Sequence, residues 1–111
     1  MPTFKTPLHP GEILREEFLV PLGMSAGQLA RSIDVPRTRI ERIVREEMGI
    51  SADTALRLAR YFGTTPELWL NLQQSHEIAV SAPALRDQLK AIEPRAGANE
   101  NFAAWERRTF G

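Results

Sequence analysis

Residues 25–45, which read "SAGQLARSIDVPRTRIERIVR", decide the fold of this chain. Ser25 and Gln28 form a capping-box pattern, which is typical of a helix N-terminus that precedes apolar residues. Asp34 follows where a tight turn is needed, and Asp tolerates a left-handed backbone better than most residues other than glycine. Pro36 suits the first turn of a second helix, because its missing N–H costs nothing there. The stretch therefore predicts two short helices joined by a tight turn.

The second of these helices is predicted from about Pro36 to Glu46 and has two chemically different faces. At about 100° per residue, the apolar side chains gather on one side of the helix, which we expect to be buried. They are Ile40, Ile43 and Val44. The opposite side is expected to carry Thr38, Arg42 and Arg45, with Arg39 on its flank. The helix thus presents a basic, exposed face.

The positive charge of the chain is concentrated in this segment. The 111 residues contain 14 Lys and Arg and 14 Asp and Glu, so the formal net charge is zero. Residues 31–45 nevertheless hold five arginines against only Asp34 and Glu41, which gives a local net charge of +3. A polyanionic partner would therefore meet the chain here.

The remainder of the chain also favours helices. Helical spacing and capping residues predict further helices over residues 10–20, 52–62, 66–80 and 83–92. We expect Pro21 and Pro83 to end the helices that precede them. No alternating strand pattern is present, so the predicted fold class is all-α. The expected organisation is a helical domain over residues 1–80, followed by an extension over residues 81–111 with a short helix and a weakly ordered tail.

Apolar residues of the two helices that follow residue 50 are expected in the core. They are Ala55, Leu56, Leu58, Ala59, Phe62, Leu68, Trp69, Leu72 and Ile78. Trp69 has an alternative role as an anchor of a dimer interface, because a large aromatic side chain suits either environment.

Composition argues against several classes of protein. Apolar residues make up 42% and charged residues 25% of the chain, which are ordinary values for one globular domain. The chain has no cysteine, so we expect no disulfide framework and no thiolate site. No apolar run is long enough for a signal peptide or a membrane span. We expect a cytoplasmic protein without membrane contact.

The residue types of catalytic and metal sites are too sparse to predict an enzyme. The chain has only two histidines and no cysteine, which argues against a metal site. His9 and Glu12 are better explained as residues that shape the start of the first helix. Ser25, Ser32 and His76 show neither a nucleophile elbow nor a paired base. We therefore expect no catalytic role, no metal and no cofactor.

Two helices joined by a tight turn, with a basic face on the second, form a helix-turn-helix pattern. In this motif the second helix lies in the DNA major groove, and its N-terminal residues face the base edges. Arginine suits this role, because its fork of donors can bind guanine O6 and N7 together. The predicted base-reading residues are Arg37, Thr38 and Arg42, the predicted phosphate contacts are Arg31, Arg39 and Arg45, and Pro36 starts the helix at the DNA. The alternative is that these arginines only solvate an outward face.

The order of motifs over about residues 8–75 resembles the HigA-type antitoxins, within the XRE/Cro-like helix-turn-helix family. Besides the stretch quoted first, the motifs that carry the resemblance are "HPGE" (9–12), "SADTALRLARYFGT" (51–64) and "PELWLNLQ" (66–73). The resemblance implies a compact five-helix, lambda-repressor-like domain that binds operator DNA as a homodimer and represses its own operon. It also implies neutralisation of a HigB-type toxin, a RelE-like ribonuclease that cleaves messenger RNA.

Residues 45–48, "REEM", depart from the family pattern, which usually has an Asn-Gly turn followed by basic residues at this point. The turn lacks its favoured residues. Glu46 and Glu47 instead bring negative charge near the place where DNA phosphates would lie. Because of this departure, the operator sequence, the affinity for DNA and the end of this helix can differ from those of the family.

Two other classes of function remain open beside the antitoxin. One is a stand-alone XRE-type regulator without a toxin partner, and the other is a protein-binding module that no longer contacts DNA. For a toxin, the candidate contact surfaces are the N-terminal segment, the first helix with Arg15, Glu16 and Glu17, and the tail after Pro83.

Overall fold

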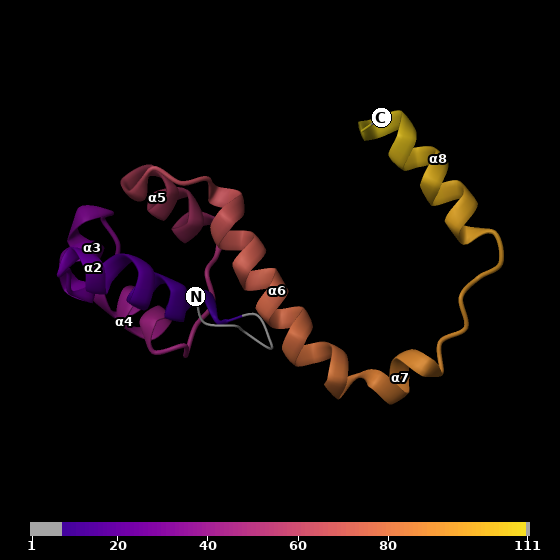
Figure 1. Cartoon of the computed structure of the whole chain (residues 1–111), viewed down its shortest axis with the longest axis horizontal. Coiled ribbons are helices and arrows are strands. Elements are labelled where there is room, and N and C mark those ends of the chain that lie inside the picture. The colour runs from indigo at the N-terminus through magenta and orange to yellow at the C-terminus, as the bar shows by residue number, and fades with distance from the viewer. Residues whose placement is uncertain (1–7, 111) are drawn as a thin grey trace. The chain divides into compact units, whose positions relative to one another are not determined.

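The computed structural model describes the backbone of residues 8–110 and the side chains of residues 8–97 and 103–109. Within these residues the chain forms helices and connecting turns but no strand, so the all-α prediction is confirmed (Figure 1). The chain divides into two compact units between Ser81 and Ala82. No helix in the described part of the chain is both long and apolar enough to cross a lipid bilayer.

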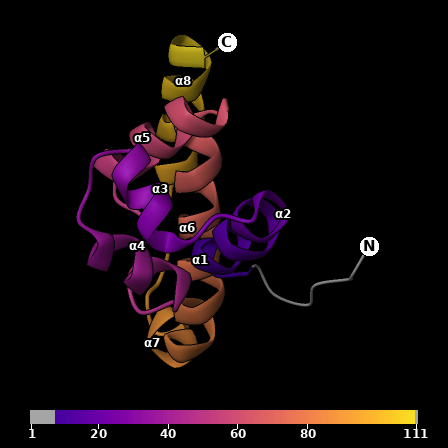
Figure 2. The same cartoon turned by 90° about the vertical axis from the view of Figure 1, so that its left-hand side faces the viewer.

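The first unit is built from five consecutive helices within its described residues. The first helix is continuous through three segments: α1 (Pro10–Ile13), the π-helical η1 (Leu14–Leu19) and α2 (Val20–Leu22). The others are α3 (Ala26–Ser32), α4 (Arg37–Val44), α5 (Ala52–Phe62) and the part of α6 (Pro66–Ala84) that precedes Ala82. Segments α3 and α4 contact each other, and α1 contacts α4 (Figure 2). The predicted compact five-helix domain is confirmed.

The core of this unit receives apolar side chains from all five helices. Its buried members are Leu14, Leu19, Leu29, Ala30, Ile33, Ile40, Ile43, Ile50, Ala55, Leu58, Ala59 and Trp69. Trp69 is fully buried, so its assignment to the core is confirmed. Burial of one continuous apolar cluster supplies the main favourable term in folding.

Three residues that we expected in the core are exposed instead. Leu56, Leu68 and Ile78 are wrongly predicted, and the most exposed is Ile78, at 66%. Each helix buries only one stripe of its surface. Leu56 lies next in sequence to Ala55, and one residue is about 100° of rotation, which turns Leu56 away from the stripe.

Pro21 does not end the first helix, so that prediction is wrong. The helix continues past Pro21 to Leu22 and ends at Gly23, whose φ of 62° is left-handed. In η1 the turns are wider, and the N–H of Val20 donates to the carbonyl of Arg15, five residues earlier. A wider turn moves the carbonyl that would otherwise clash with the proline ring, which explains how the helix accommodates Pro21.

Pro83 likewise lies inside its helix, because α6 ends only at Ala84. The prediction that Pro83 breaks this helix is wrong, because the helix continues through it. Only Ala84 follows Pro83 in α6, so the hydrogen bond that proline cannot make is lost where the helix ends in any case. The second unit contains α7 (Arg86–Lys90) and α8 (Ala98–Phe110). The sequence analysis did not predict helical backbone over residues 98–110. Whether this tail is weakly ordered is a question about its motion, so that expectation stays a prediction.

Three predicted helix starts are confirmed by hydrogen bonds. Ser25 Oγ accepts from the N–H of Gln28 at 3.1 Å, and Gln28 Oε1 accepts from the N–H of Ser25 at 2.8 Å, which completes the capping box. Ser51 and Thr65 accept backbone N–H groups at the starts of α5 and α6. Each cap satisfies a donor that has no carbonyl partner within its helix.

His9 caps the start of α1, which confirms its predicted role there. Its Nδ1 accepts a hydrogen bond from the N–H of Gly11 at 2.9 Å, and its ring centroid lies 4.9 Å from that of His76. Burial first, and the neighbouring His76 second, lower the pKa of His9. The fold therefore stabilises the neutral imidazole, because a protonated Nδ1 cannot accept the capping hydrogen bond.

Acidification is expected to destabilise the protein through His9. The pKa of His9 is lower in the folded than in the unfolded chain, so the unfolded state binds the proton more readily. The contribution of neutral His9 to the free energy of unfolding is complete above the unfolded pKa of about 6.5. It is lost as the pH falls through the pKa of His9 in the folded chain. Urea unfolding at a series of pH values would measure this loss. His9→Asn keeps a capping side chain that does not titrate and should flatten the profile, whereas an unchanged profile would contradict the assignment.

Candidate nucleic-acid interface

Segments α3 and α4 are joined by the tight turn that the sequence predicted. Asp34 has a left-handed backbone with φ 57°. The N–H of Val35 donates to the carbonyl of Ala30 at 3.0 Å. The N–H of Asp34 donates to the carbonyl of Arg31 at 3.4 Å. These two hydrogen bonds form a Schellman motif, which ends α3 and directs the chain into α4.

Helix α4 is anchored by Ile40 and Ile43, which are fully buried, while its opposite side is exposed. The exposed members of the predicted DNA-binding set are Arg31, Pro36, Arg37, Thr38, Arg42 and Arg45. Pro36 precedes the helix as its N-cap, with φ −60° and ψ 140°, so its predicted position in the first turn is corrected by one residue. The amphipathic pattern thus correctly predicted which side of α4 faces away from the core.

Ion pairs distinguish the arginines of this surface. Arg37 and Arg45 both pair with Glu41: Arg37 Nε lies 2.8 Å from Glu41 Oε1, and Arg45 Nη2 lies 3.6 Å from Glu41 Oε2. Arg39 is half-buried, and its Nη1 lies 2.7 Å from Asp53 Oδ2 on α5. The guanidinium of Arg39 is therefore held on the flank of α4, where the sequence analysis placed this residue.

Arg42 and Arg31 differ from these three arginines. Arg42 is exposed, and none of the ion pairs among residues 8–97 and 103–109 includes it. Its full charge is therefore available to a ligand. Arg31, on α3, borders a surface hollow together with Leu22 and Tyr61, so its neighbours come from α2 and α5. The structure thus gathers the α4 residues on one face and places Arg31 beside a different set of side chains.

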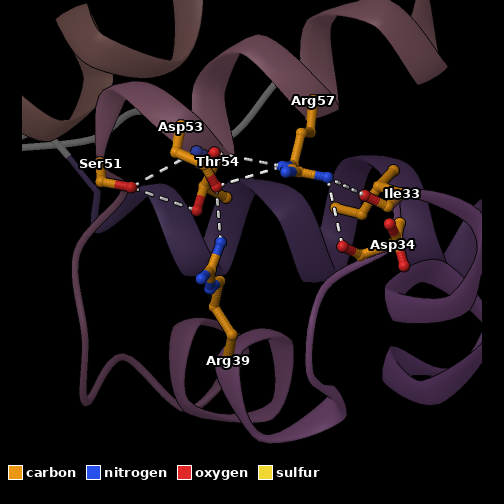
Figure 3. Close-up of polar contacts among 7 residues, drawn as sticks. All are labelled: Ile33, Asp34, Arg39, Ser51, Asp53, Thr54 and Arg57. Atoms are coloured by element: carbon orange, nitrogen blue, oxygen red, sulfur yellow. Dashed lines mark hydrogen bonds and ion pairs between the residues drawn. The ribbon is translucent and has the colours of Figure 1, made fainter.

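Two residues of α5, Asp53 and Arg57, hold the turn in place, a role that the sequence analysis did not predict. Arg57 Nη1 donates to the carbonyl of Ile33 at 2.8 Å and to that of Asp34 at 3.2 Å, so it caps the end of α3. Arg57 Nε donates to Asp53 Oδ2 at 3.1 Å, and the same carboxylate accepts from Arg39 (Figure 3). Asp53 therefore links the turn to α4.

The carboxylate of Asp53 is stabilised in its charged form. Hydrogen bonds from Arg39 first and from Arg57 second lower its pKa. The pairing of Asp53 with Arg57 was predictable, because residues four apart are neighbours on a helix. The contact with Arg39 was not, because it depends on how α4 packs beside α5.

The first helix holds the other end of α4. Arg15 Nη1 donates to the carbonyl of Val44, and Arg15 Nη2 lies 3.6 Å from Glu46 Oε2. A cation is favoured at this position by the partial negative charge of the helix C-terminus. Arg15 also pairs with Glu16 at 3.0 Å. Two of the candidate toxin contacts, Arg15 and Glu16, are thus engaged within the chain.

The segment "REEM" ends α4 in the way that Asp34 ends α3. Glu46 has φ 63°. Its N–H donates to the carbonyl of Ile43 at 2.9 Å, which is one bond of a Schellman motif. The N–H of Glu47 donates to the carbonyl of Arg42 at 2.9 Å, which is the other. A glutamate therefore occupies a left-handed position that glycine adopts without steric cost.

Replacing Glu46 by glycine is expected to raise the free energy of unfolding by about 1 kcal/mol, because a non-glycine residue in this conformation costs about 1–2 kcal/mol. Urea unfolding followed by circular dichroism would measure the change. Glu46→Gln is the control, since it removes the charge but keeps the left-handed side chain, and it should change stability by less than about 0.5 kcal/mol. A glycine variant less stable than the parent would contradict this account of the turn.

Two helices joined by a left-handed turn, the second with a buried apolar face and an exposed arginine face, define a helix-turn-helix protein. Comparison with known proteins agrees. A family model described as helix-turn-helix matches residues 14–69, which include α3, α4 and α5. The chain belongs to the helix-turn-helix family, and within it to the HigA-type antitoxins, as the sequence motifs indicated.

Two relatives and one solved structure are similar to this chain over most of its length. Virulence-associated protein I of Dichelobacter nodosus is 54% identical over 74 residues, which cover 67% of this chain and 68% of the relative. Antitoxin HigA-1 of Vibrio cholerae serotype O1 is 30% identical over 92 residues, which cover 83% of this chain and 87% of the relative. A solved structure of Pseudomonas aeruginosa antitoxin HigA with the higBA promoter matches with a TM-score of 0.76 and 47% identity, covering 79% of this chain and 97% of that chain.

Proposed function

We propose that this chain is the antitoxin of a type II toxin–antitoxin system and a sequence-specific repressor of its own operon. The observation that carries the proposal is the exposed arginine face of α4 on a fold whose solved relatives include an antitoxin with promoter DNA. In this proposal α4 lies in the major groove, and its N-terminal residues Arg37 and Thr38 face the base edges.

The proposal includes a set of partners. The DNA-binding domain comprises residues 1–80, acts as a homodimer and binds a palindromic operator whose half-sites lie about 34–36 Å apart, one helical turn of DNA. The protein partner is a HigB- or RelE-like ribonuclease toxin, which the antitoxin neutralises. The chain itself has no catalytic role, and binding to the operator places it in the cytoplasm with the chromosome.

One experiment tests both partners. The product of the neighbouring gene is co-expressed with the antitoxin, the complex is purified, and its own promoter is footprinted with the antitoxin alone and with the complex. Co-purification and a protected palindrome are expected, and light scattering should give a dimer of the antitoxin. Protection without any toxin-like neighbour would leave a stand-alone regulator. The absence of a specific footprint would overturn the repressor and leave a protein-binding module.

Arg42 and Arg45 are expected to affect DNA binding in different ways. Arg42→Ala should weaken operator binding by about 1–3 kcal/mol and flatten the sequence preference, because a base contact is lost. Arg45→Ala should weaken binding to all DNA equally and make the salt dependence shallower, because a phosphate contact is lost. Fluorescence anisotropy on operator and shuffled DNA at several salt concentrations separates the two. An equal loss on both DNAs for Arg42→Ala would show that Arg42 contacts phosphate.

A further inference from the structure

Helix α4 carries a single acid, Glu41, among its three arginines. Each oxygen of this carboxylate faces a different arginine: Oε1 lies 2.8 Å from Arg37 Nε, and Oε2 lies 3.6 Å from Arg45 Nη2. The side chain of Glu41 is 27% exposed, against 74% for Arg37 and 64% for Arg45. Both arginine side chains that pair with this carboxylate are therefore much more exposed than it is.

This arrangement brings a negative charge to the DNA together with the arginines. Arg37 and Arg45 are one turn away from Glu41 on either side, so a DNA that contacts both arginines also comes near Glu41. Near the phosphates the carboxylate is repelled, and arginines that share it neutralise less phosphate charge. Glu41 is therefore expected to weaken binding to a DNA that offers it no hydrogen-bond donor.

The major groove contains one donor that suits a carboxylate. The exocyclic N4 amino group of cytosine donates there, and Glu and Asp side chains accept from it. A DNA that presents this group beside Arg37 or Arg45 satisfies Glu41, whereas other sequences leave a charged acceptor near phosphates without a partner. An unsatisfied group of this kind discriminates by penalty rather than by attraction.

We propose that Glu41 is a specificity-determining residue, which disfavours non-operator DNA and accepts a hydrogen bond from a cytosine amino group in each operator half-site. The proposal rests on the proposed function of the chain as an operator-binding repressor. It differs from the arginine contacts, because it assigns discrimination to the one residue of α4 that repels DNA.

The test measures the affinities of the full chain for a promoter fragment and for a shuffled duplex of the same length, at several salt concentrations. Glu41→Gln and Glu41→Ala should bind shuffled DNA about fivefold more tightly, with a salt slope steeper by about one unit. Their operator affinity should change less than twofold, because the lost hydrogen bond offsets the removed repulsion, so the ratio of operator to shuffled affinity falls about fivefold. Glu47→Gln is the matched control. It removes the same charge beyond the end of α4 and should leave the ratio unchanged.

A second arm identifies the base. Each C·G pair of the operator is replaced in turn. Replacement of one pair in each half-site should weaken operator binding by the parent protein but not by Glu41→Ala. If the ratio is unchanged in both Glu41 variants while the parent still prefers its operator, the role of Glu41 is overturned but the proposed function stands. A parent that does not prefer the operator overturns the proposed function. A ratio that falls equally for Glu47→Gln shows a general charge effect and also overturns the role of Glu41.

Discussion

Replacing Trp69 by alanine is expected to lower the free energy of unfolding by about 3–5 kcal/mol, the loss typical of a buried aromatic side chain. Trp69 is fully buried, and its ring centroid lies 5.0 Å from that of Phe18 and 6.4 Å from that of Phe62. Its Nε1 also donates to Thr64 Oγ1 at 2.9 Å. The substitution therefore removes ring contacts between the first helix, α5 and α6 and leaves a cavity among them.

Urea unfolding followed by circular dichroism measures this loss. A loss of this size is a large part of the total stability of a small domain, which is about 5–15 kcal/mol. Leu56→Ala is the control, because Leu56 lies on α5 with 59% of its surface exposed and should change stability by less than about 0.5 kcal/mol. Equal effects of the two substitutions would show that Trp69 does not hold the core together.

Gly11→Ala is the second substitution with a large expected effect, a loss of about 3 kcal/mol. A Cβ atom on Gly11 would lie only 1.8 Å from the carbonyl oxygen of Ile43. This neighbour is backbone, so α1 and α4 would have to separate. Because Ile43 anchors the helix that carries the proposed DNA contacts, operator binding should weaken as well.

Gly27→Ala provides the contrast for Gly11. A Cβ atom on Gly27 would lie 3.5 Å from Arg37 Cδ, which is an ordinary contact with a flexible side chain. Alanine inside a helix is favoured over glycine by about 0.5–1 kcal/mol, so this variant should be slightly more stable. If Gly11→Ala unfolds at the same urea concentration as the parent, the close approach of α1 to α4 is not present in solution.

The parts of this protein that follow from the sequence are those governed by neighbours in the chain. The capping box at Ser25, the left-handed turn at Asp34 and the amphipathic pattern of α4 each involve residues that lie within one short stretch of the sequence. Hydrogen bonds and spacing over such short distances can be read directly from residue types. The family motifs added the five-helix fold and the function, which local patterns alone do not contain.

The DNA-binding roles of individual residues remain predictions, but the structure shows that the predicted arginines differ in their ion pairs. Arg37, Arg42 and Arg45 carry the same charge, but their surroundings differ. Glu41 pairs with Arg37 and Arg45 and not with Arg42. Sequence spacing allowed this i,i+4 pairing. The choice of rotamer that brings both guanidinium groups to one carboxylate depends on the surrounding surface, and spacing does not specify it.

By itself, the sequence determined the two helices, the turn between them and the side of α4 that is basic, because each depends on local hydrogen bonds or on the helical period. Only the tertiary structure decided which residues hold that helix in place. Gly11, Arg15 and Asp53 are distant from α4 in sequence, yet they contact its backbone or side chains. Their roles come from the packing of helices, and packing depends on the shapes of all the side chains at once rather than on any short stretch.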